Sequence, residues 1–194
     1  KPAGTALLSG WIIMDLLRAA GLPDGVINFL PGKGSVVGEV ALYHPDLAGI
    51  HFTGSTPVFR GMWKTVGDNL ERYKSFPRLV GETGGKDFVF AHPSADNAAL
   101  SVALVRGAFE YQGQKCSAAS RAYVPRSLWP DLRDRLVDML AQVTVGDPTD
   151  FSHFMGAVID QASFETCQRY IEQARADTNC TIVAGGECDG RSGW

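Results

Sequence analysis

Apolar and polar residues alternate along the first part of the chain in a pattern that predicts helices and strands in turn. Apolar side chains fall on one helical face over residues 5–20, and residues 36–43 and 54–70 predict two further helices. Short apolar runs at 26–30 and 48–53 predict strands. Strands that alternate with helices are joined by crossovers, so we expect a parallel, doubly wound α/β sheet.

The rest of the chain shows the same mixture and predicts a second α/β unit. We expect an N-terminal domain over residues 1–78 and a second domain over 79–194. Asp96 is predicted to lie at the start of one helix, and Ser127 to cap the next. The predicted strands are 78–81, 88–91, 121–124 and 181–184. The predicted helices are 96–111, 127–140 and 162–176.

Composition excludes several classes of protein. Hydrophobic residues make up 45% of the 194 residues, which is enough for a folded core. The net charge is −3 and basic residues form no run, so we expect no nucleic-acid partner. No stretch of about 18 apolar residues occurs, so we expect no membrane span.

Cysteine and histidine spacings speak against a metal centre. The four cysteines (Cys116, Cys167, Cys180 and Cys188) form no C-x-x-C pair, and the four histidines are scattered. We therefore expect no metal site, and we expect the three later cysteines to be buried thiols or bystanders in a reducing compartment. The chain begins at Lys1 without a methionine and stops just after a Gly-rich turn, which favours an internal fragment of a longer enzyme.

The sequence Gly113-Gln114-Lys115-Cys116-Ser117 marks a candidate nucleophile. A single cysteine is usually a small buried apolar residue. Cys116, however, follows a Gly-Gln turn and has polar neighbours on both sides. A nearby ammonium group or helix N-terminus would favour the thiolate. Both interpretations stay open on local context alone.

Glu82 is a candidate general base. A glutamate is usually solvated surface, but Gly84-Gly85 follows this one and lets the backbone approach a ligand closely. A carboxylate at a strand end, close to a thioester, can take a proton from water. Together, Cys116 and Glu82 suit the formation and hydrolysis of a covalent thioester.

The segment Gly54-Ser55-Thr56-Pro57 is a candidate phosphate site. It follows a predicted strand and opens a predicted helix, where free N–H groups and a hydroxyl favour an anion. The same residues also suit a simple helix cap with proline in the first turn. The glycines at 32, 34 and 38 have the wrong spacing for the G-x-G-x-x-G dinucleotide fingerprint.

Taken jointly, these motifs resemble the aldehyde dehydrogenase superfamily over essentially the whole chain. Two longer segments, Phe76–Phe88 and Arg106–Ala118, are similar to the branch that oxidises L-glutamate γ-semialdehyde (1-pyrroline-5-carboxylate) to L-glutamate in proline breakdown. The motifs, in the order of the superfamily, are Lys1-Pro2, Pro31-Gly32-x-Gly34, Phe52-Thr53-Gly54-Ser55, Glu82-x-Gly84-Gly85-Lys86 and Gly113-Gln114-x-Cys116.

The resemblance implies a fold and a cofactor. The expected fold is α/β, aldehyde dehydrogenase-like: part of a Rossmann-type NAD-binding domain followed by part of an α/β catalytic domain. The cofactor would be NAD, with Lys1 on the adenosine ribose and Ser55 on a phosphate. The remaining residues expected to line the pyrophosphate site are Gly54, Thr56, Pro57 and Val58.

The resemblance also implies catalytic roles. Cys116 would attack the aldehyde, its backbone N–H would form half of an oxyanion hole, and Glu82 would activate the hydrolytic water. Ser117 and Lys115 would receive the substrate carboxylate. Family parts expected before Lys1 and after Trp194 are missing, so we expect the isolated fragment to be inactive.

The expected partners are a small-molecule substrate and, for the parent enzyme, further copies of itself in a dimer or larger homo-oligomer. The expected compartment is a bacterial cytoplasm, with the mitochondrial matrix as the alternative. Three other functions stay open. They are a dehydrogenase for another semialdehyde such as succinate semialdehyde, a cysteine hydrolase without NAD, and a non-catalytic descendant of the enzyme.

Overall fold

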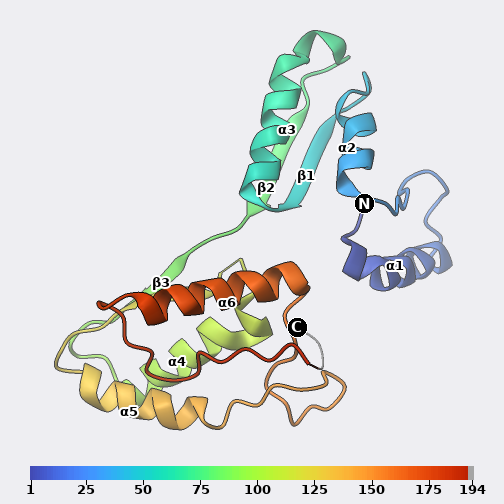
Figure 1. The fold of residues 1–194 in the computed structure, drawn as a ribbon. Coiled ribbons are helices and arrows are strands. Elements are labelled where there is room, and N and C mark those ends of the chain that lie inside the picture. Colours follow the sequence, from blue (N-terminus) through green and yellow to red (C-terminus); the bar gives the residue numbers. More distant parts are fainter. Residues whose placement is uncertain (192–194) are drawn as a thin grey trace. The chain divides into compact units, whose positions relative to one another are not determined.

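The computed structural model describes residues 1–191, which form two compact units (Figure 1). Unit 1 comprises residues 1–83, and unit 2 begins at Gly84. The division falls a few residues after the expected domain boundary at 78, because the strand that starts at Arg78 pairs within unit 1. Residues 192–194, the last of the expected second domain, lie outside the described residues.

Unit 1 contains a two-stranded parallel sheet with helices before and between its strands. The pairing runs from Gly49 opposite Arg78 to Gly54 opposite Thr83, so the carboxyl ends of both strands lie at one edge. The three predicted helices and the strand at 48–53 are confirmed with small shifts of their bounds. The elements are η1 (Gly4–Ala6), α1 (Leu7–Ala19), α2 (Gly34–Leu42), β1 (Gly49–Gly54), α3 (Thr56–Asp68), η2 (Leu70–Arg72) and β2 (Arg78–Thr83).

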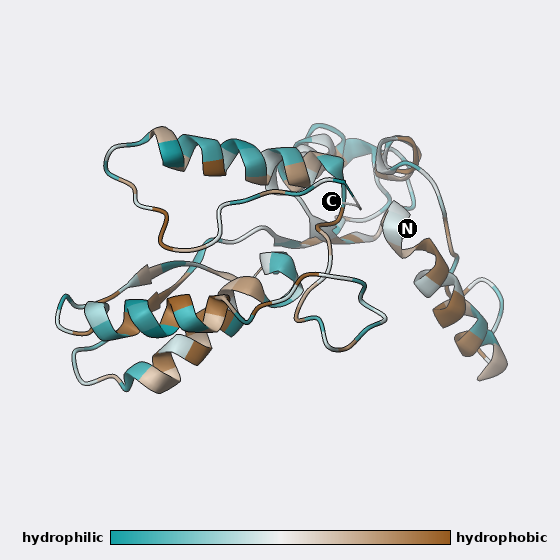
Figure 2. Ribbon diagram, turned by 60° about the horizontal axis from the view of Figure 1, so that its bottom comes forward, coloured by the Kyte–Doolittle hydropathy of each residue, from teal (hydrophilic) through white to brown (hydrophobic). Residues whose placement is uncertain are grey.

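Helix α1 ends in a glycine turn. Gly21 has φ +91°, and its N–H donates to the Arg18 carbonyl while the Leu22 N–H donates to the Leu17 carbonyl. This pair of bonds is the Schellman arrangement, which needs a residue without a Cβ at the left-handed position. The helix itself is largely apolar along its length (Figure 2), and of its residues only Met14 is buried.

Aromatic packing fixes helix α3 on the sheet of unit 1. The Phe59 ring stacks on Phe52 of β1 at 5.9 Å and meets Trp63 edge-on at 6.4 Å. A Cβ added at Gly81 of β2 would collide with the Phe59 ring. The absence of a side chain at Gly81 therefore lets the helix approach the sheet. Side chains on the other face of the strands, including Glu82, are left away from α3.

Unit 2 is a second two-stranded parallel sheet with three helices. Strand β3 pairs with β4 from Asp87 opposite Ala119 onward, with one register shift, so both strands begin at the same edge. The predicted strands at 88–91 and 121–124 and the three predicted helices are confirmed with shifted bounds. The elements are β3 (Asp87–Phe90), α4 (Asn97–Phe109), η3 (Glu110–Gly113), β4 (Ala119–Tyr123), α5 (Trp129–Leu140) and α6 (Gln161–Ala176).

The core of unit 2 lies between its sheet and helices α4 and α5. Leu132 of α5 is fully buried and packs with Ala91, Leu100 and Leu104. Helix α4 is set by its N-cap, because the Asp96 carboxylate accepts a hydrogen bond of 2.8 Å from the Ala99 N–H. The prediction for Asp96 is therefore confirmed.

Three local predictions are wrong. Residues 26–30 form no strand, because they cover α1 instead, with Phe29 against Trp11 at 6.0 Å. Residues 181–184 form no strand either; they lie between a turn at Cys180 and left-handed Gly185. Ser127 does not cap α5, since the Leu128 and Trp129 N–H groups bond to the Pro125 carbonyl and Leu128 takes the N-cap position.

No helix within residues 1–191 is long and apolar enough to cross a membrane.

The core of unit 2 yields a stability prediction. Replacing Leu132 by alanine leaves a cavity at a side chain with no exposed surface, so it should lower the free energy of unfolding by about 2–5 kcal/mol. Urea unfolding of the protein that contains this chain measures the change. The matched control is Val137→Ala on the same helix, where the side chain is 37% exposed and the expected loss is below about 1 kcal/mol. Equal losses for the two variants would contradict the assigned core.

Candidate active site

Cys116 lies in a short turn immediately before strand β4. The Ala118 N–H donates to the Lys115 carbonyl at 3.2 Å and closes this turn around Cys116 and Ser117. Because β3 and β4 are parallel neighbours, the segments that precede them meet at one edge of the sheet. A Cβ added at Gly85 would lie 2.7 Å from the Cys116 carbonyl oxygen. Glycine at position 85 therefore allows the backbone to pass directly against the turn that carries the thiol.

A left-handed segment precedes the cysteine turn. Tyr111, Gln112 and Gly113 have φ values of +52°, +58° and +67°. Each non-glycine residue in this region costs about 1–2 kcal/mol, so two of them in succession need support from their surroundings. At Gly113 a side chain is also excluded by space, since a Cβ would lie 2.7 Å from the Ala108 carbonyl oxygen.

Two glutamine side chains tie this segment to residues 157–159. The Gln112 Nε2 group donates to the Ala157 carbonyl at 3.0 Å. The Gln114 Oε1 atom accepts from the Ile159 N–H, also at 3.0 Å. Both bonds link positions 45 residues apart in the chain, so they anchor the segment to the body of unit 2.

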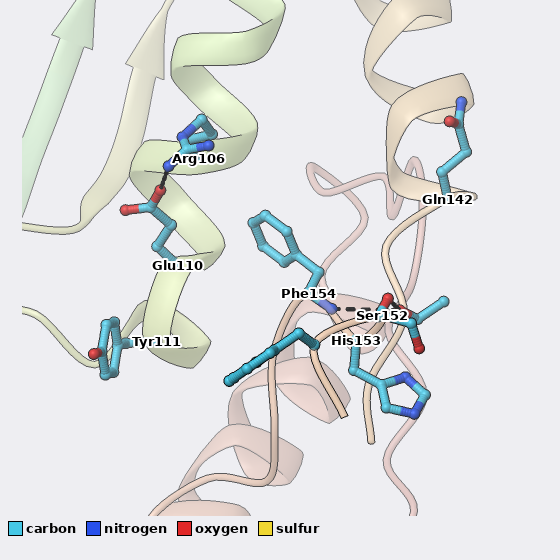
Figure 3. A pocket seen from close by; sticks show the side chains of 9 residues that line it. Arg106, Glu110, Tyr111, Gln142, Ser152, His153 and Phe154 are labelled. Carbon is cyan, nitrogen blue, oxygen red and sulfur yellow. Dashed lines mark hydrogen bonds and ion pairs between the residues drawn. The ribbon is translucent and has the colours of Figure 1, made fainter. Parts of the chain in front are cut away.

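Charged side chains bracket the same segment. Glu110, at the end of α4, pairs through one carboxylate oxygen with Arg106 (Figure 3) and through the other with Lys115 Nζ at 2.8 Å. The hydrogen bond from Lys115, with the charge of Arg106 adding to it, holds the pKa of the Glu110 carboxyl below its usual value. Glu110 is therefore ionised at neutral pH. The Lys115 ammonium also lies 5.4 Å from the centre of the Tyr111 ring.

Exposure alone does not distinguish the candidate nucleophile. All four cysteines are free and exposed, so the three later ones are not the buried thiols that were one expectation for them. Ser117 beside Cys116 is exposed as well. What sets Cys116 apart is its loop, which is strained, held by side chains on both sides and in contact with the backbone of Gly85. An exposed thiol in a fixed loop has the access and the placement that nucleophilic chemistry needs.

The second group of candidate residues lies at the carboxyl edge of the unit 1 sheet. In the β1–β2 register Thr53 is opposite Glu82, and Gly54 is opposite Thr83. Glu82 is exposed and lies one strand away from the start of α3. The structure thus brings Glu82 and the expected phosphate segment to the same edge, which is where open α/β sheets bind ligands.

The start of α3 presents unused hydrogen-bond donors. Helix geometry leaves the N–H groups of Ser55, Thr56 and Val58 without an intrahelical acceptor, and Pro57 has no N–H. The N-cap is Ser55, whose hydroxyl makes no capping hydrogen bond within the described residues. No acidic residue occupies the first turn, so the positive end of the helix dipole is not offset there. This end of α3 suits a phosphate group.

The sequence-predicted residues thus fall into two groups. Cys116, Lys115 and Ser117 belong to unit 2, whereas Glu82 and residues 54–58 belong to unit 1, and Gly84 directly follows the division. Lys1 is exposed and lies in unit 1, ahead of η1.

Sequence reasoning missed the charged and amide side chains around the nucleophile loop. The spacing of Arg106 and Glu110 on a predicted helix is an i, i+4 pair, which was a usable signal. Nothing in the sequence marks Gln112, because its partner is a backbone carbonyl distant along the chain. Gly85 was expected to approach a ligand, and in the structure it approaches the Cys116 carbonyl.

An open pocket of about 650 Å³ lies beside the charged group, between the end of α4 and residues 142–154 (Figure 3). Arg106, Glu110 and Tyr111 line one side of it, and His153 lies on the other. Over residues 1–191, no cluster of three or more His, Cys, Asp or Glu side chains could hold a metal ion.

Comparison with known proteins finds relatives that share one name. The chain is 54% identical over 196 residues to mitochondrial delta-1-pyrroline-5-carboxylate dehydrogenase of Dictyostelium discoideum and 47% identical over 195 residues to the human protein of that name. Each alignment covers 100% of this chain and 35% of the relative. The chain therefore spans about a third of the length of these curated relatives.

Solved structures agree with this result. The delta-pyrroline-5-carboxylate dehydrogenase of Mycobacterium tuberculosis matches with a TM-score of 0.93 and 53% identity, covering 96% of this chain and 35% of that one. The 1-pyrroline-5-carboxylate dehydrogenase from Thermus with bound NAD matches with a TM-score of 0.89 and 32% identity, covering 98% and 36%. The expectation of a partial aldehyde dehydrogenase fold is confirmed.

The model of the aldehyde dehydrogenase family matches residues 1–194, so the chain belongs to the aldehyde dehydrogenase family.

Proposed function

We propose that the protein containing this chain oxidises L-glutamate γ-semialdehyde, the open form of 1-pyrroline-5-carboxylate, to L-glutamate with NAD as hydride acceptor. The observation that carries the proposal is the placement of Cys116. Its thiol is exposed in a turn that follows a strained, anchored segment, and the backbone of Gly85 passes against this turn. The named activity of the Dictyostelium and human relatives supports the choice of substrate.

Cys116 is the proposed nucleophile. Its sulfur, as thiolate, bonds to the aldehyde carbon, and the carbonyl electron pair moves to oxygen to give a thiohemiacetal anion. The hydrogen bond that closes the turn uses the Ala118 N–H, so the Cys116 N–H stays outside that bond and can donate to the oxyanion. When bound, NAD would accept the hydride, so that the thiohemiacetal becomes a thioester held on Cys116.

Glu82 is the proposed general base for the second half of the reaction. Its carboxylate takes a proton from water, the hydroxide adds to the thioester carbon, and the thiolate of Cys116 leaves. The products are the carboxylic acid and the free enzyme. Glu82 is exposed to solvent, which gives it access to the water that it must activate.

The residues at the start of α3 fit the proposed cofactor. The pyrophosphate would accept hydrogen bonds from the N–H groups of Thr56 and Val58 and from the Ser55 hydroxyl, with Gly54 and Pro57 shaping the approach. We assign Lys1 to the adenosine ribose, as the family resemblance implies. The Thermus relative, which contains NAD, supports this choice of cofactor.

The substrate carboxylate needs donors near Cys116. Ser117 is exposed next to the thiol and is the proposed ligand. Lys115 is the second candidate, but its ammonium already bonds to Glu110, so it would have to leave that partner to hold a substrate. Succinate semialdehyde, whose carboxylate lies one carbon closer to its aldehyde, is the alternative substrate.

Assembly and location remain predictions. The proposed assembly is a homo-oligomer, and the compartment is a bacterial cytoplasm or a mitochondrial matrix. The Dictyostelium and human relatives are named as mitochondrial proteins.

The first prediction concerns the nucleophile. With 1-pyrroline-5-carboxylate and NAD, the protein that contains this chain should form NADH, and Cys116→Ala should lower kcat by about a thousandfold or more. Cys167→Ala is the control, because that thiol is also exposed but lies on α6, and the rate of this variant should stay within about twofold. If NADH forms only with succinate semialdehyde, that aldehyde replaces L-glutamate γ-semialdehyde as the proposed substrate. No oxidation of any aldehyde would refute the proposed function.

The second prediction separates the two half-reactions. In Glu82→Gln, hydride transfer should proceed while hydrolysis stalls, so NADH should appear as a burst of about one equivalent followed by a steady state lower by about 10²–10⁴-fold. Stopped-flow absorbance measures the burst, and mass spectrometry should find the acyl group on Cys116. A variant that loses the burst together with the steady state would assign Glu82 to an earlier step.

The third prediction concerns the backbone contact. Gly85→Ala should lower kcat by about 10–100-fold, because the added Cβ would lie 2.7 Å from the Cys116 carbonyl oxygen and must displace the turn. The control is Gly84→Ala, since a Cβ at Gly84 meets no atom within 4 Å. Steady-state kinetics of both variants tests the difference, and equal losses would argue against a specific contact at position 85.

A further inference from the structure

We propose that Glu110 is a positioning residue for Cys116, acting by clamping the two ends of the left-handed segment that carries the nucleophile loop. The inference rests on the proposed function to the extent that Cys116 is taken as the reactive group. The charged side chains of Glu110, Arg106 and Lys115 act together in this role. The Lys115 ammonium helps to hold the loop in place.

Glu110 stands at the point where helix α4 ends. Its backbone, with φ −53° and ψ 136°, has already left the helical conformation, and Tyr111 after it is left-handed. The carboxylate has two oxygens and uses both. One pairs with Arg106, a turn back on the helix, and the other accepts from Lys115 Nζ at 2.8 Å, directly before Cys116. The carboxylate thus joins the helix to the far end of the segment.

The charged group is partly withdrawn from water. The side chains of Glu110 and Lys115 are 28% and 34% exposed, whereas Arg106 is 65% exposed. A pair that is partly screened from solvent interacts more strongly than one on the open surface. Figure 3 shows Arg106 on α4 beside Glu110, which directly follows that helix, and then Tyr111.

The segment needs such a clamp because its backbone is strained. Tyr111 and Gln112 occupy a region that non-glycine residues avoid, so a free segment would relax toward negative φ. Strain of this kind persists only where surrounding contacts over-determine the conformation. The glutamine bonds to Ala157 and Ile159 hold its middle, and Glu110 holds its two ends.

The clamp also gives Lys115 a definite position. Its ammonium faces the Glu110 carboxylate and lies 5.4 Å from the Tyr111 ring centre, both within the segment itself. A lysine held in this way shapes the loop without contacting substrate. This differs from direct binding of the substrate carboxylate, and the two roles predict different kinetics.

Kinetics on four variants test the inference. In the protein that contains this chain, Glu110→Gln and Lys115→Met should each lower kcat about tenfold and leave KM within about threefold. The double variant should be no slower than the slower single variant, because both changes break one interaction. The matched control is Asp134→Asn, which breaks the exposed Arg133–Asp134 pair on α5 and should leave both constants unchanged. A KM that rises more than tenfold in Lys115→Met alone would overturn the inference and assign Lys115 to the substrate.

Amide hydrogen exchange gives a readout that does not need the reaction. Exchange of the amides of residues 111–117 should become about tenfold faster in Glu110→Gln and in Lys115→Met, and stay unchanged in Asp134→Asn. Unchanged exchange in all three variants would overturn the inference even if the enzyme is active. If no aldehyde is oxidised but the exchange rises as expected, the clamp stands and the proposed function fails.

Discussion

The close approach of the Gly85 backbone to the Cys116 carbonyl is the constraint on which the candidate site depends. It follows from topology, because two parallel neighbouring strands bring the segments before them to one edge. The contact leaves no room for a side chain between the two segments. It also fixes where the cysteine turn can lie, so the left-handed segment and its anchors must adapt to that position.

The candidate residues lie at the carboxyl edge of one sheet and at the starting edge of the other. In unit 1 the carboxyl edge carries Glu82 and the start of α3, an arrangement suited to phosphate and water. In unit 2 the edge where the strands begin carries the thiol. Residues 84–86 lead from one sheet to the other, and the glycines there leave the backbone unencumbered by side chains. The proposed general base and the proposed nucleophile thus belong to different units of the chain.

Sequence predicted the helices well because their apolar periodicity is local. It also identified Asp96 correctly, since an acidic residue ahead of a helical pattern has one common role. Strands were harder, because a strand exists only with a neighbour. Residues 26–30 have the apolar pattern but pack on α1. Glu82 and Cys116 were proposed from local context and motif order, and their roles stay predictions. The Glu110–Lys115 pair depends on a left-handed turn between the two residues, which periodicity does not reveal.

Because Gly85 meets Cys116 through main-chain atoms, the path of the chain sets part of the position of the proposed nucleophile, beside the side chains that anchor its loop. Residues next to the thiol, such as Ser117, can then change without removing that contact. The main-chain contact sets the position of the loop, whereas the exposed side chains of the loop determine what it can bind. Recognition by the loop and placement of its thiol can therefore change independently of each other.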